Sequence, residues 1–403
     1  MKICGIIAEY NPFHSGHAHH VAMTKKNTGC DHVVCLMSGC FTQRGEPAIF
    51  DKWLRAKAAV SCGADLVLEL PTLYALRSAE GFAHGSVKIL HDLGIDYLSF
   101  GSETDDLKSL KDISSILTDE PNEYRRLLKE SLSLGLSFPA SREIALSKYT
   151  ANNDISAMIT GSNSILGIEY LKALGRTNST MMPSIVQRQG KAYNDDKIAP
   201  ELSSATAIRK HILENGMDDL IYKNMPKEAF ELFAYKIDSG FIPVSKYDFF
   251  NNVLYSIRKY SLSEIKDILE VTEGLENKIK KSAEISKNYD ELIDNIKSKR
   301  FTHTRIQRIL CYILLGITKS LSKKADKKSP KNIKVLAYKK KSAHLLSHFT
   351  KNTDINLFHS AVGLDEDLFT KIDIRATDIY SLAQDKQKFY KSNQDFTKKT
   401  PTD

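Results

Sequence analysis

Two histidines separated by two residues stand shortly after an apolar stretch near the start of the chain. The stretch is Ile3–Ala8, and the histidines are His14 and His17. Residues three apart lie on the same face of a helix, so both imidazoles would point to one side of a first helical turn. The backbone N–H groups and the positive end of the helix dipole point the same way. Such a turn can hold a polyphosphate and donate hydrogen bonds to charge that develops on an α-phosphate.

The residues around these histidines predict a strand that ends at a turn. Residues 3–8 are apolar apart from Gly5, which is typical of a buried parallel strand, and Asn11-Pro12 ends it. Gly16 leaves room for a ligand to approach the backbone. The pattern resembles the HxGH signature of the nucleotidyltransferase superfamily. The alternative is a pair of exposed histidines at a helix start. Their position between a strand and a helix favours the nucleotide site.

A second candidate for phosphate binding lies about 190 residues further along the chain, in the segment 203–209. Ser203, Ser204 and Thr206 place hydroxyl groups at a predicted helix N-terminus, and Arg209 follows one turn later. Alone, this pattern is more typical of an ordinary N-cap with a solvated arginine. Together with the two histidines, it resembles the second signature of the same superfamily, a Ser/Thr-rich turn followed by Arg.

Strands and helices alternate from residue 1 to about residue 216. Further strands are expected at 32–37, 64–71, 95–100 and 182–188, with helices at 51–62 and 75–93 among them. This order predicts an α/β fold with a Rossmann-like, doubly wound parallel sheet, in which ligands bind at the carboxyl ends of the strands. From about residue 218 the chain is predicted to be mainly helical, with one strand-like segment at 333–338, and residues 386–403 are predicted to be a flexible polar tail.

Composition excludes some classes of protein. The 403 residues carry a formal net charge of +8, which fits a polyanionic partner. No membrane-spanning run and no signal peptide is evident, so we expect a cytoplasmic protein. Cys30, Cys35 and Cys40, with His32 between them, could suggest a metal site. Because Cys35 falls inside an apolar strand, we instead expect reduced thiols in the core and no protein-bound metal.

Five segments of the N-terminal half together resemble the bacterial tRNA(Met) cytidine acetate ligase family. They are residues 8–17, 43–48, 63–71, 162–167 and 203–209, and the C-terminal half agrees mainly at 302–308 and 373–380. The family pattern usually has Asn at the position of Ser15. Because this position is expected to point away from both histidines, we expect the difference to have little consequence.

The resemblance implies an enzyme that forms acetyl-adenylate and pyrophosphate from ATP and acetate. It would then transfer the acetyl group to N4 of the wobble cytidine of elongator tRNA(Met), giving N4-acetylcytidine. The nucleotide contacts that it implies fall on one loop and three further positions, namely Ile7, Ala8, Glu9, Tyr10, Asn11, Pro12, Phe13, His14, Ser15, Gly16, His17, Ala18, His19 and His20, with Gly101, Asn163 and Arg188.

Physical roles can be assigned to these residues. His14 and His17 would stabilise the α-phosphate during attack by acetate. Arg209, with the hydroxyls of Ser203, Ser204 and Thr206, would hold the departing pyrophosphate. Mg²⁺ bound to the phosphates is expected from the reaction, although no cluster of carboxylates in the sequence indicates a site for it. The acetyl-transfer site is less defined: Arg44, Glu46 and Asp51 are candidates for it, or form a solvated loop with ion pairs.

The residues 217–385 would then bind tRNA, and 1–216 would form the ATP-binding catalytic domain. Lys327, Lys328, Lys339 and Lys340 are candidate phosphate contacts, although lysine runs are often only solvated loops. Two other functions stay open. One is a small-molecule adenylyltransferase of the pantetheine-phosphate or nicotinamide-nucleotide type. The other is a non-catalytic RNA-binding protein on a nucleotidyltransferase scaffold, which the presence of His14, His17 and Arg209 disfavours.

Overall fold

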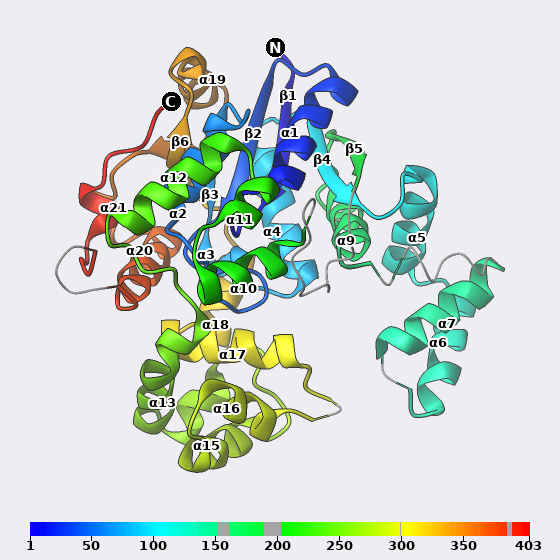
Figure 1. The fold of residues 1–403 in the computed structure, drawn as a ribbon. Coiled ribbons are helices and arrows are strands. Elements are labelled where there is room, and N and C mark those ends of the chain that lie inside the picture. The colour runs from blue at the N-terminus through cyan, green and yellow to red at the C-terminus, as the bar shows by residue number, and fades with distance from the viewer. Residues whose placement is uncertain (137, 152–158, 160, 189–202, 299, 385–388) are drawn as a thin grey trace.

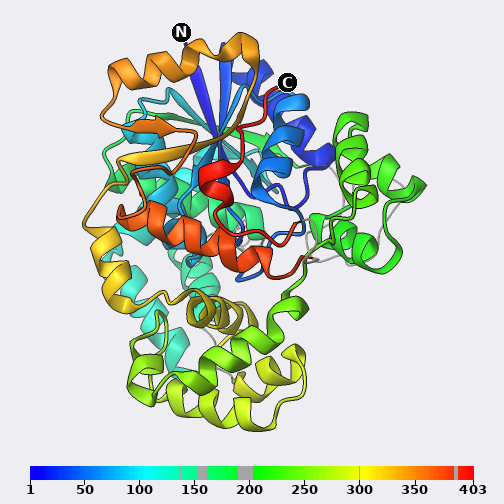
Figure 2. The same cartoon turned by 90° about the vertical axis from the view of Figure 1, so that its left-hand side faces the viewer.

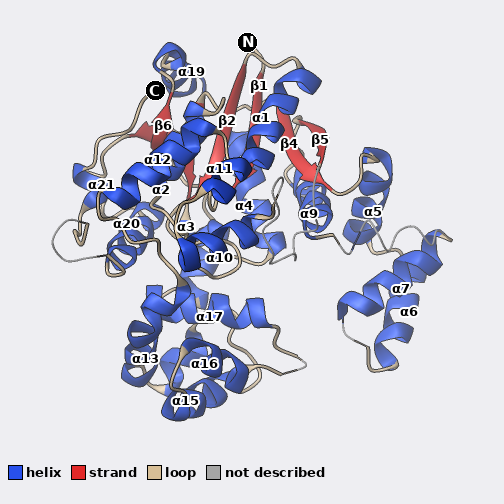
Figure 3. Ribbon diagram, viewed as in Figure 1, coloured by secondary structure: helices blue, strands red, loops and turns tan. Residues whose placement is uncertain are grey.

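A computed structural model describes residues 1–136, 138–151, 159, 161–188, 203–298, 300–384 and 389–403. Seven strands form one sheet in the order β5-β4-β1-β2-β3-β6-β7 (Figure 3). The five from β5 to β3 are parallel, β6 runs antiparallel to β3, and β7 is parallel to β6. The bounds are β1 Ile3–Ala8, β2 His32–Ser38, β3 Leu66–Leu70, β4 Tyr97–Ser102, β5 Met182–Gln187, β6 Asn332–Tyr338 and β7 Asn356–Phe358.

The predicted doubly wound sheet is confirmed. The chain builds β1, β2 and β3 toward one edge and then returns to place β4 on the other side of β1. This reversal puts a topological switch point between β1 and β4, where ligands bind beyond the carboxyl ends of the strands. The sheet differs from the prediction in its last two strands, β6 and β7, which come from the C-terminal region.

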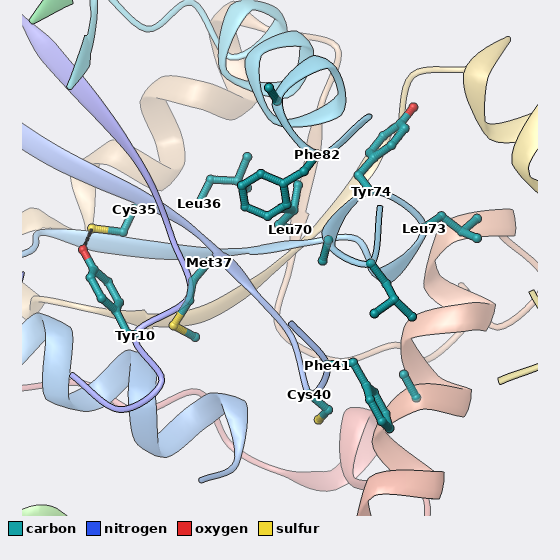
Figure 4. Close-up of a cluster of buried hydrophobic side chains, with 14 of the residues drawn as sticks. Tyr10, Cys35, Leu36, Met37, Cys40, Phe41, Leu70, Leu73, Tyr74 and Phe82 are labelled. Atoms are coloured by element: carbon teal, nitrogen blue, oxygen red, sulfur yellow. Dashed lines mark hydrogen bonds between the residues drawn. The ribbon is translucent and has the colours of Figure 1, made fainter. Parts of the chain in front are cut away.

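The central strands are held by burial on both faces. Every residue from Val33 to Ser38 is buried, as is all of β3. Cys35 lies in this core, where its Sγ atom is 3.2 Å from the hydroxyl oxygen of Tyr10 (Figure 4). All six cysteines are free thiols. The expectation of reduced thiols in the core is therefore confirmed for Cys35 and Cys40, which are fully covered by neighbouring side chains.

Helices cover both faces of the sheet, and two further groups of helices extend from it (Figure 1). One group projects beyond β4, comprising α5 Leu107–Asp119, α6 Asn122–Ser133 and α7 Phe138–Thr150. The helices nearest the sheet include α1 Ser15–Thr28, α2 Lys52–Ser61, α3 Thr72–Ala75, α4 Ala79–Asp92, α9 Ser162–Arg176, α10 Ala205–Asn215, α11 Asp219–Asn224 and α12 Lys227–Asp238. The helix predicted over 75–93 is found as α4, which begins four residues later at Ala79, and the short helix α3 precedes it.

The second group lies beneath the sheet in Figure 2. It consists of η1 Lys246–Phe249, α13 Phe250–Lys259, α14 Leu262–Asp267, α15 Leu275–Ile285, α16 Tyr289–Ile296, α17 His303–Leu315 and α18 Lys319–Asp326. The chain then returns to the sheet through β6, η2 Lys340–Ser342, α19 His344–Asn352, β7, α20 Leu368–Ser381 and α21 Gln394–Thr397. The boundary at residue 216 stays a prediction about folding units, but the sheet itself draws strands from both sides of it.

The described part of the predicted flexible tail is docked on the sheet, so the structure corrects that expectation. Asp395 is 2% exposed, and its carboxylate lies 2.8 Å from Nζ of Lys52 and 3.2 Å from Nζ of Lys334. Burial opposes the carboxylate charge, but the two ammonium groups outweigh it and lower the pKa of Asp395. Asp395 thus anchors the described tail to α2 and β6, while most other residues from 389 to 403 are exposed or partly exposed.

Candidate active site

A cavity of about 430 Å³ opens at the carboxyl ends of β1, β4 and β5. Most of the predicted nucleotide-binding residues line it. They are Ile7, Ala8, Glu9, Tyr10, Asn11, His14, Gly16, His17, His19, His20, Gly101, Asn163, Arg188, Ser203 and Arg209. The other predicted positions lie around the cavity without lining it, namely Pro12, Phe13, Ser15, Ala18, Ser204 and Thr206. The structure therefore brings the two turns predicted to bind phosphate to one place.

The two histidines form the entry to helix α1. His14 is the N-cap residue, one position before the helix, and its Nδ1 accepts a hydrogen bond from Gly16 N at 3.0 Å. His17 Nδ1 faces the backbone N–H of His14 at 3.3 Å, and the ring centroids are 3.9 Å apart. Because each Nδ1 is an acceptor, the proton of each neutral ring is on Nε2. Each Nε2–H is then a donor for a ligand.

Burial sets the charge of these rings. It lowers the pKa of His14 to about 3, with the nearby charges of Arg188 and Arg209 acting in the same direction. Burial also lowers the pKa of His17, and the nearby His14 lowers it further. Both imidazoles are therefore neutral near pH 7, so they act on a phosphate as hydrogen-bond donors and not as cations.

Gly16 has a role that the sequence did not indicate. A Cβ atom at this position would lie 2.9 Å from Cε1 and 3.2 Å from Nδ1 of His14. The missing side chain thus makes room for the imidazole of His14, in addition to any room it leaves for a ligand.

The turn at 203–209 meets the histidine loop through Arg209. Its Nη1 donates to the backbone carbonyl of Asn11 at 2.9 Å, and its Nη2 lies 3.3 Å from Oγ1 of Thr206. Ser204 caps α10 by accepting a hydrogen bond from Ala207 N at 3.1 Å. The guanidinium is thus fixed next to the histidine loop, although about 200 residues separate them in the chain.

The end of β4 and the start of α9 form the third side of the cavity. Glu103 accepts hydrogen bonds from the side-chain amide of Asn163 at 2.7 Å and from Ser164 N at 2.7 Å, at the N-terminus of α9. Arg188 lies across Gly101, since a Cβ there would be 3.5 Å from Cγ of Arg188. Sequence reasoning found Gly101, Asn163 and Arg188 through resemblance alone and missed the capping role of Glu103.

An apolar wall completes the cavity, formed by side chains that no sequence pattern pointed to. Phe82 of α4, Phe100 of β4, and Leu166 and Tyr170 of α9 all line it. They belong to helices and strands that meet only in the folded chain. The cavity therefore combines arginines and histidines with an aromatic surface, a combination that suits a nucleotide.

The three candidates for the acetyl-transfer site separate in the structure. Arg44 lines the cavity. Glu46 lies behind it, 3.8 Å from Nη2 of Arg209, and accepts a hydrogen bond from Gln307 Nε2 at 2.9 Å. Asp51 instead caps α2 and pairs with Lys398 at 3.1 Å. Asp51 therefore has a structural role at a distance from the cavity lining.

Helix α17 packs directly on the loop that carries Arg44 and Glu46. Gly45 has φ of +79°, and Cys311 of α17 donates to its carbonyl oxygen at 3.1 Å. Thr304 of the same helix lines the cavity. Helix α17 thus contributes Thr304 to the cavity lining and supports the neighbouring loop of Arg44, and both contacts come from the segment 302–315.

The four candidate RNA-contacting lysines do not form one patch. Lys327 caps the end of α18, and the carbonyl of Lys328 accepts a hydrogen bond from the Tyr74 hydroxyl at 3.0 Å. Lys339 directly follows the C-terminal end of β6. Its Nζ lies 4.0 Å from Oδ1 of Asp65, which precedes β3 at the end of the sheet opposite the cavity. The seven residues of β6 separate the two pairs.

The described residues contain no group of three or more histidine, cysteine, aspartate and glutamate side chains arranged to hold a metal ion. Among the same residues, no helix has the length and apolar character needed to span a bilayer.

Comparisons with known proteins agree with this geometry. The model of the HIGH Nucleotidyl Transferase family matches residues 1–395. A tRNA(Met) cytidine acetate ligase of Acetivibrio thermocellus is 45% identical, over 98% of this chain and 99% of that protein. One from Thermoanaerobacter sp. is 43% identical, over 95% and 96%.

Solved structures give the same result. The apo crystal structure of Thermotoga maritima TmcAL superposes with a TM-score of 0.93 at 31% identity, covering 100% of this chain and 99% of that one. A second form of the same protein, bound with alpha-thio ATP, gives a TM-score of 0.91 at 30% identity, with coverage of 100% and 99%.

Proposed function

The chain belongs to the HIGH nucleotidyl transferase family, among its tRNA(Met) cytidine acetate ligases, and we propose that it is an ATP-dependent acetate ligase. It would form acetyl-adenylate from ATP and acetate and transfer the acetyl group to N4 of the wobble cytidine of elongator tRNA(Met). One observation carries the proposal: His14, His17 and Arg209 converge on one cavity from opposite ends of the α/β sequence. Near-complete coverage of the ligase relatives favours this function over a small-molecule adenylyltransferase.

In the first half-reaction, an acetate oxygen attacks the α-phosphorus of ATP, and the bond from that phosphorus to the bridging oxygen of pyrophosphate breaks. The Nε2–H groups of His14 and His17 donate to the non-bridging oxygens, where negative charge increases. Arg209 holds the departing pyrophosphate, together with Ser203, Ser204 and Thr206. These are neutral and cationic donors, so nothing in this group repels the phosphates.

The nucleoside would lie on the third side of the cavity. Gly101 lets it approach the end of β4, Asn163 presents an amide that Glu103 orients, and Arg188 lies alongside. The structural relative that contains alpha-thio ATP supports ATP as the nucleotide.

The described cavity residues do not suit a protein-bound Mg²⁺. Glu9 is the single carboxylate among the described residues that line the cavity, and hard divalent cations need several oxygen ligands. We therefore propose that Mg²⁺ arrives as the counter-ion of the triphosphate, and no step of the reaction is assigned to an ion held by the protein.

The tRNA would approach from the side of α17, because Thr304 of this helix lines the cavity. Lys327 and Lys328 lie just beyond the neighbouring helix α18, so they are the better placed of the two lysine pairs. We retain all four lysines as proposed phosphate contacts, with the pair at 339 and 340 as the weaker candidates. The reaction would take place in the cytoplasm, with its tRNA substrate.

ATP–pyrophosphate exchange tests the first half-reaction. Exchange by the purified protein should depend on acetate, and H17N should lower it about 10²- to 10³-fold, as for the loss of an oxyanion donor. His348 lies on α19, away from the cavity lining, and H348N is the matched control that should leave exchange unchanged. Exchange without dependence on acetate, or an H17N protein as active as H348N, would refute the proposal.

A further inference from the structure

Glu9 stands at the end of β1 with its carboxylate in the cavity. Its Oε1 accepts a hydrogen bond from Gln43 N at 2.7 Å. Its Oε2 accepts no hydrogen bond from any residue within the described ranges. The backbone carbonyl of Glu9 accepts a hydrogen bond from Arg55, a completely buried side chain that also binds the carbonyls of Ser38 and Gly39. The carboxylate is therefore well positioned, with one oxygen left for a ligand.

A carboxylate is unexpected in a cavity that binds phosphates. Its negative charge repels a triphosphate and works against the arginines that line the same cavity, Arg44, Arg188 and Arg209. The charge of Glu9 therefore disfavours nucleotide binding, and a different role is needed to account for it. That purpose must involve the part of the substrates that is not phosphate.

The surroundings make Glu9 a stronger base than an ordinary glutamate. Burial raises the pKa of Glu9. The Gln43 N–H and the guanidinium groups of Arg209, Arg44 and Arg55 oppose this increase without overcoming it. From α9, the phenol of Tyr170 also faces the cavity, and its pKa is raised by its burial and by the charge of Glu9. A carboxylate of this kind can accept a proton at neutral pH.

The acetyl-transfer step requires such an acceptor. The exocyclic amine of cytidine shares its electron pair with the ring, so it is a weak nucleophile and carries a proton that must leave when the amide forms. His14 and His17 cannot take that proton, because their Nδ1 atoms accept backbone N–H groups and their Nε2 atoms carry hydrogen. Among the described residues that line the cavity, Glu9 is therefore the one carboxylate that can take this proton.

We propose that Glu9 is the general base of acetyl transfer. The cytidine N4 forms a bond with the acetyl carbonyl carbon, the bond from that carbon to the phosphate oxygen of AMP breaks, and AMP leaves as the phosphate anion. Oε2 of Glu9 accepts the proton of N4 and later releases it to water. This inference rests on the proposed function and adds a role for Glu9 beyond nucleotide contact.

The test separates the two half-reactions. E9Q keeps the size of the side chain and can keep the hydrogen bond from Gln43, but it removes the base. Single-turnover transfer from synthetic acetyl-adenylate to a tRNA(Met) transcript should fall about 10²- to 10⁴-fold. Acetate-dependent pyrophosphate exchange should fall less than tenfold. E9D, which keeps the carboxylate, should recover part of the transfer rate.

A pH profile distinguishes a base from a structural residue. Transfer by the wild-type protein should rise with pH until Glu9 is ionised and then level off, whereas E9Q should show no such rise. Glu103 also orients cavity residues, and E103Q is the matched control, expected to lower exchange and transfer by similar factors. Equal losses of exchange and transfer in E9Q, or an unchanged profile, would overturn the role of Glu9. Absence of acetyl-adenylate formation by the wild type would instead overturn the proposed function.

Discussion

Replacing Gly45 with alanine tests whether α17 is a fixed wall of the candidate active site. The new Cβ would lie 2.3 Å from the backbone nitrogen of Arg308 and 2.5 Å from the carbonyl carbon of Gln307. Both are atoms of the helix backbone, so rotating a side chain cannot relieve the overlap. The loop and α17 must separate by about 1 Å to reach ordinary contact, which lies at about 3.4 Å or beyond.

The expected cost has two parts. Alanine at φ of +79° is strained by about 1–2 kcal/mol. Overpacking a buried contact adds about 1–3 kcal/mol. G45A should therefore lower the free energy of unfolding by about 2–5 kcal/mol. It should also lower pyrophosphate exchange, by up to about 10²-fold, because the hydrogen bond from Gln307 to Glu46 behind Arg209 would be lost or displaced.

A matched control isolates the contact from the strain. Gly94 has φ of +70°, but a Cβ there would meet nothing within 4 Å. G94A should lose only about 1–2 kcal/mol and keep full exchange activity. Urea unfolding followed by circular dichroism, with exchange assays on the folded proteins, measures both effects. G45A and G94A proteins of equal stability and equal activity would show that α17 does not pack on the loop as described.

Three further predictions concern other parts of the molecule. D395A should destabilise the protein by about 3–5 kcal/mol in urea unfolding, because it leaves Lys52 and Lys334 buried with one fewer anion. An unchanged urea midpoint would mean that the tail is not docked. Burial lowers the pKa of His20 to about 4. Between pH 6.5 and 4 the imidazole of His20 is therefore protonated in the unfolded chain but not in the folded one. The free energy of unfolding should fall as the pH falls through this range. H20Q should lose less stability over that range than the wild type in acid unfolding. The double change of Lys327 and Lys328 to Ala should reduce the salt dependence of tRNA binding more than the same change at Lys339 and Lys340, and equal slopes would contradict the preferred placement.

Local patterns predicted the parts of the fold that depend on nearby residues. The strand Ile3–Ala8 has the bounds that the sequence indicated, and the mainly helical character predicted from about residue 218 is found. Convergence of His14 with Arg209 could also be expected, because parallel strands bring their carboxyl ends to one edge of the sheet. These features need only apolar periodicity and the rules of the α/β fold.

Features that depend on contacts between distant segments could not be predicted in this way. Nothing in the polar composition of residues 389–403 signals that Asp395 pairs with Lys52 in the core. The aromatic wall of Phe82 and Tyr170 and the packing of Gly45 on α17 arise only when the whole chain is folded. Glycine at position 45 was a possible signal, because a turn with positive φ favours it, but the partner helix could not be read from it.

Nucleoside analysis of elongator tRNA(Met) tests the central claim most directly. Unmodified tRNA should be incubated with the protein, ATP and isotope-labelled acetate, digested to nucleosides and examined by mass spectrometry. We predict labelled N4-acetylcytidine at the wobble position only when protein, ATP and acetate are all present, and much less of it with H17N. A wobble cytidine that stays unmodified in the complete reaction, while the protein catalyses acetate-independent nucleotide transfer, would contradict the account.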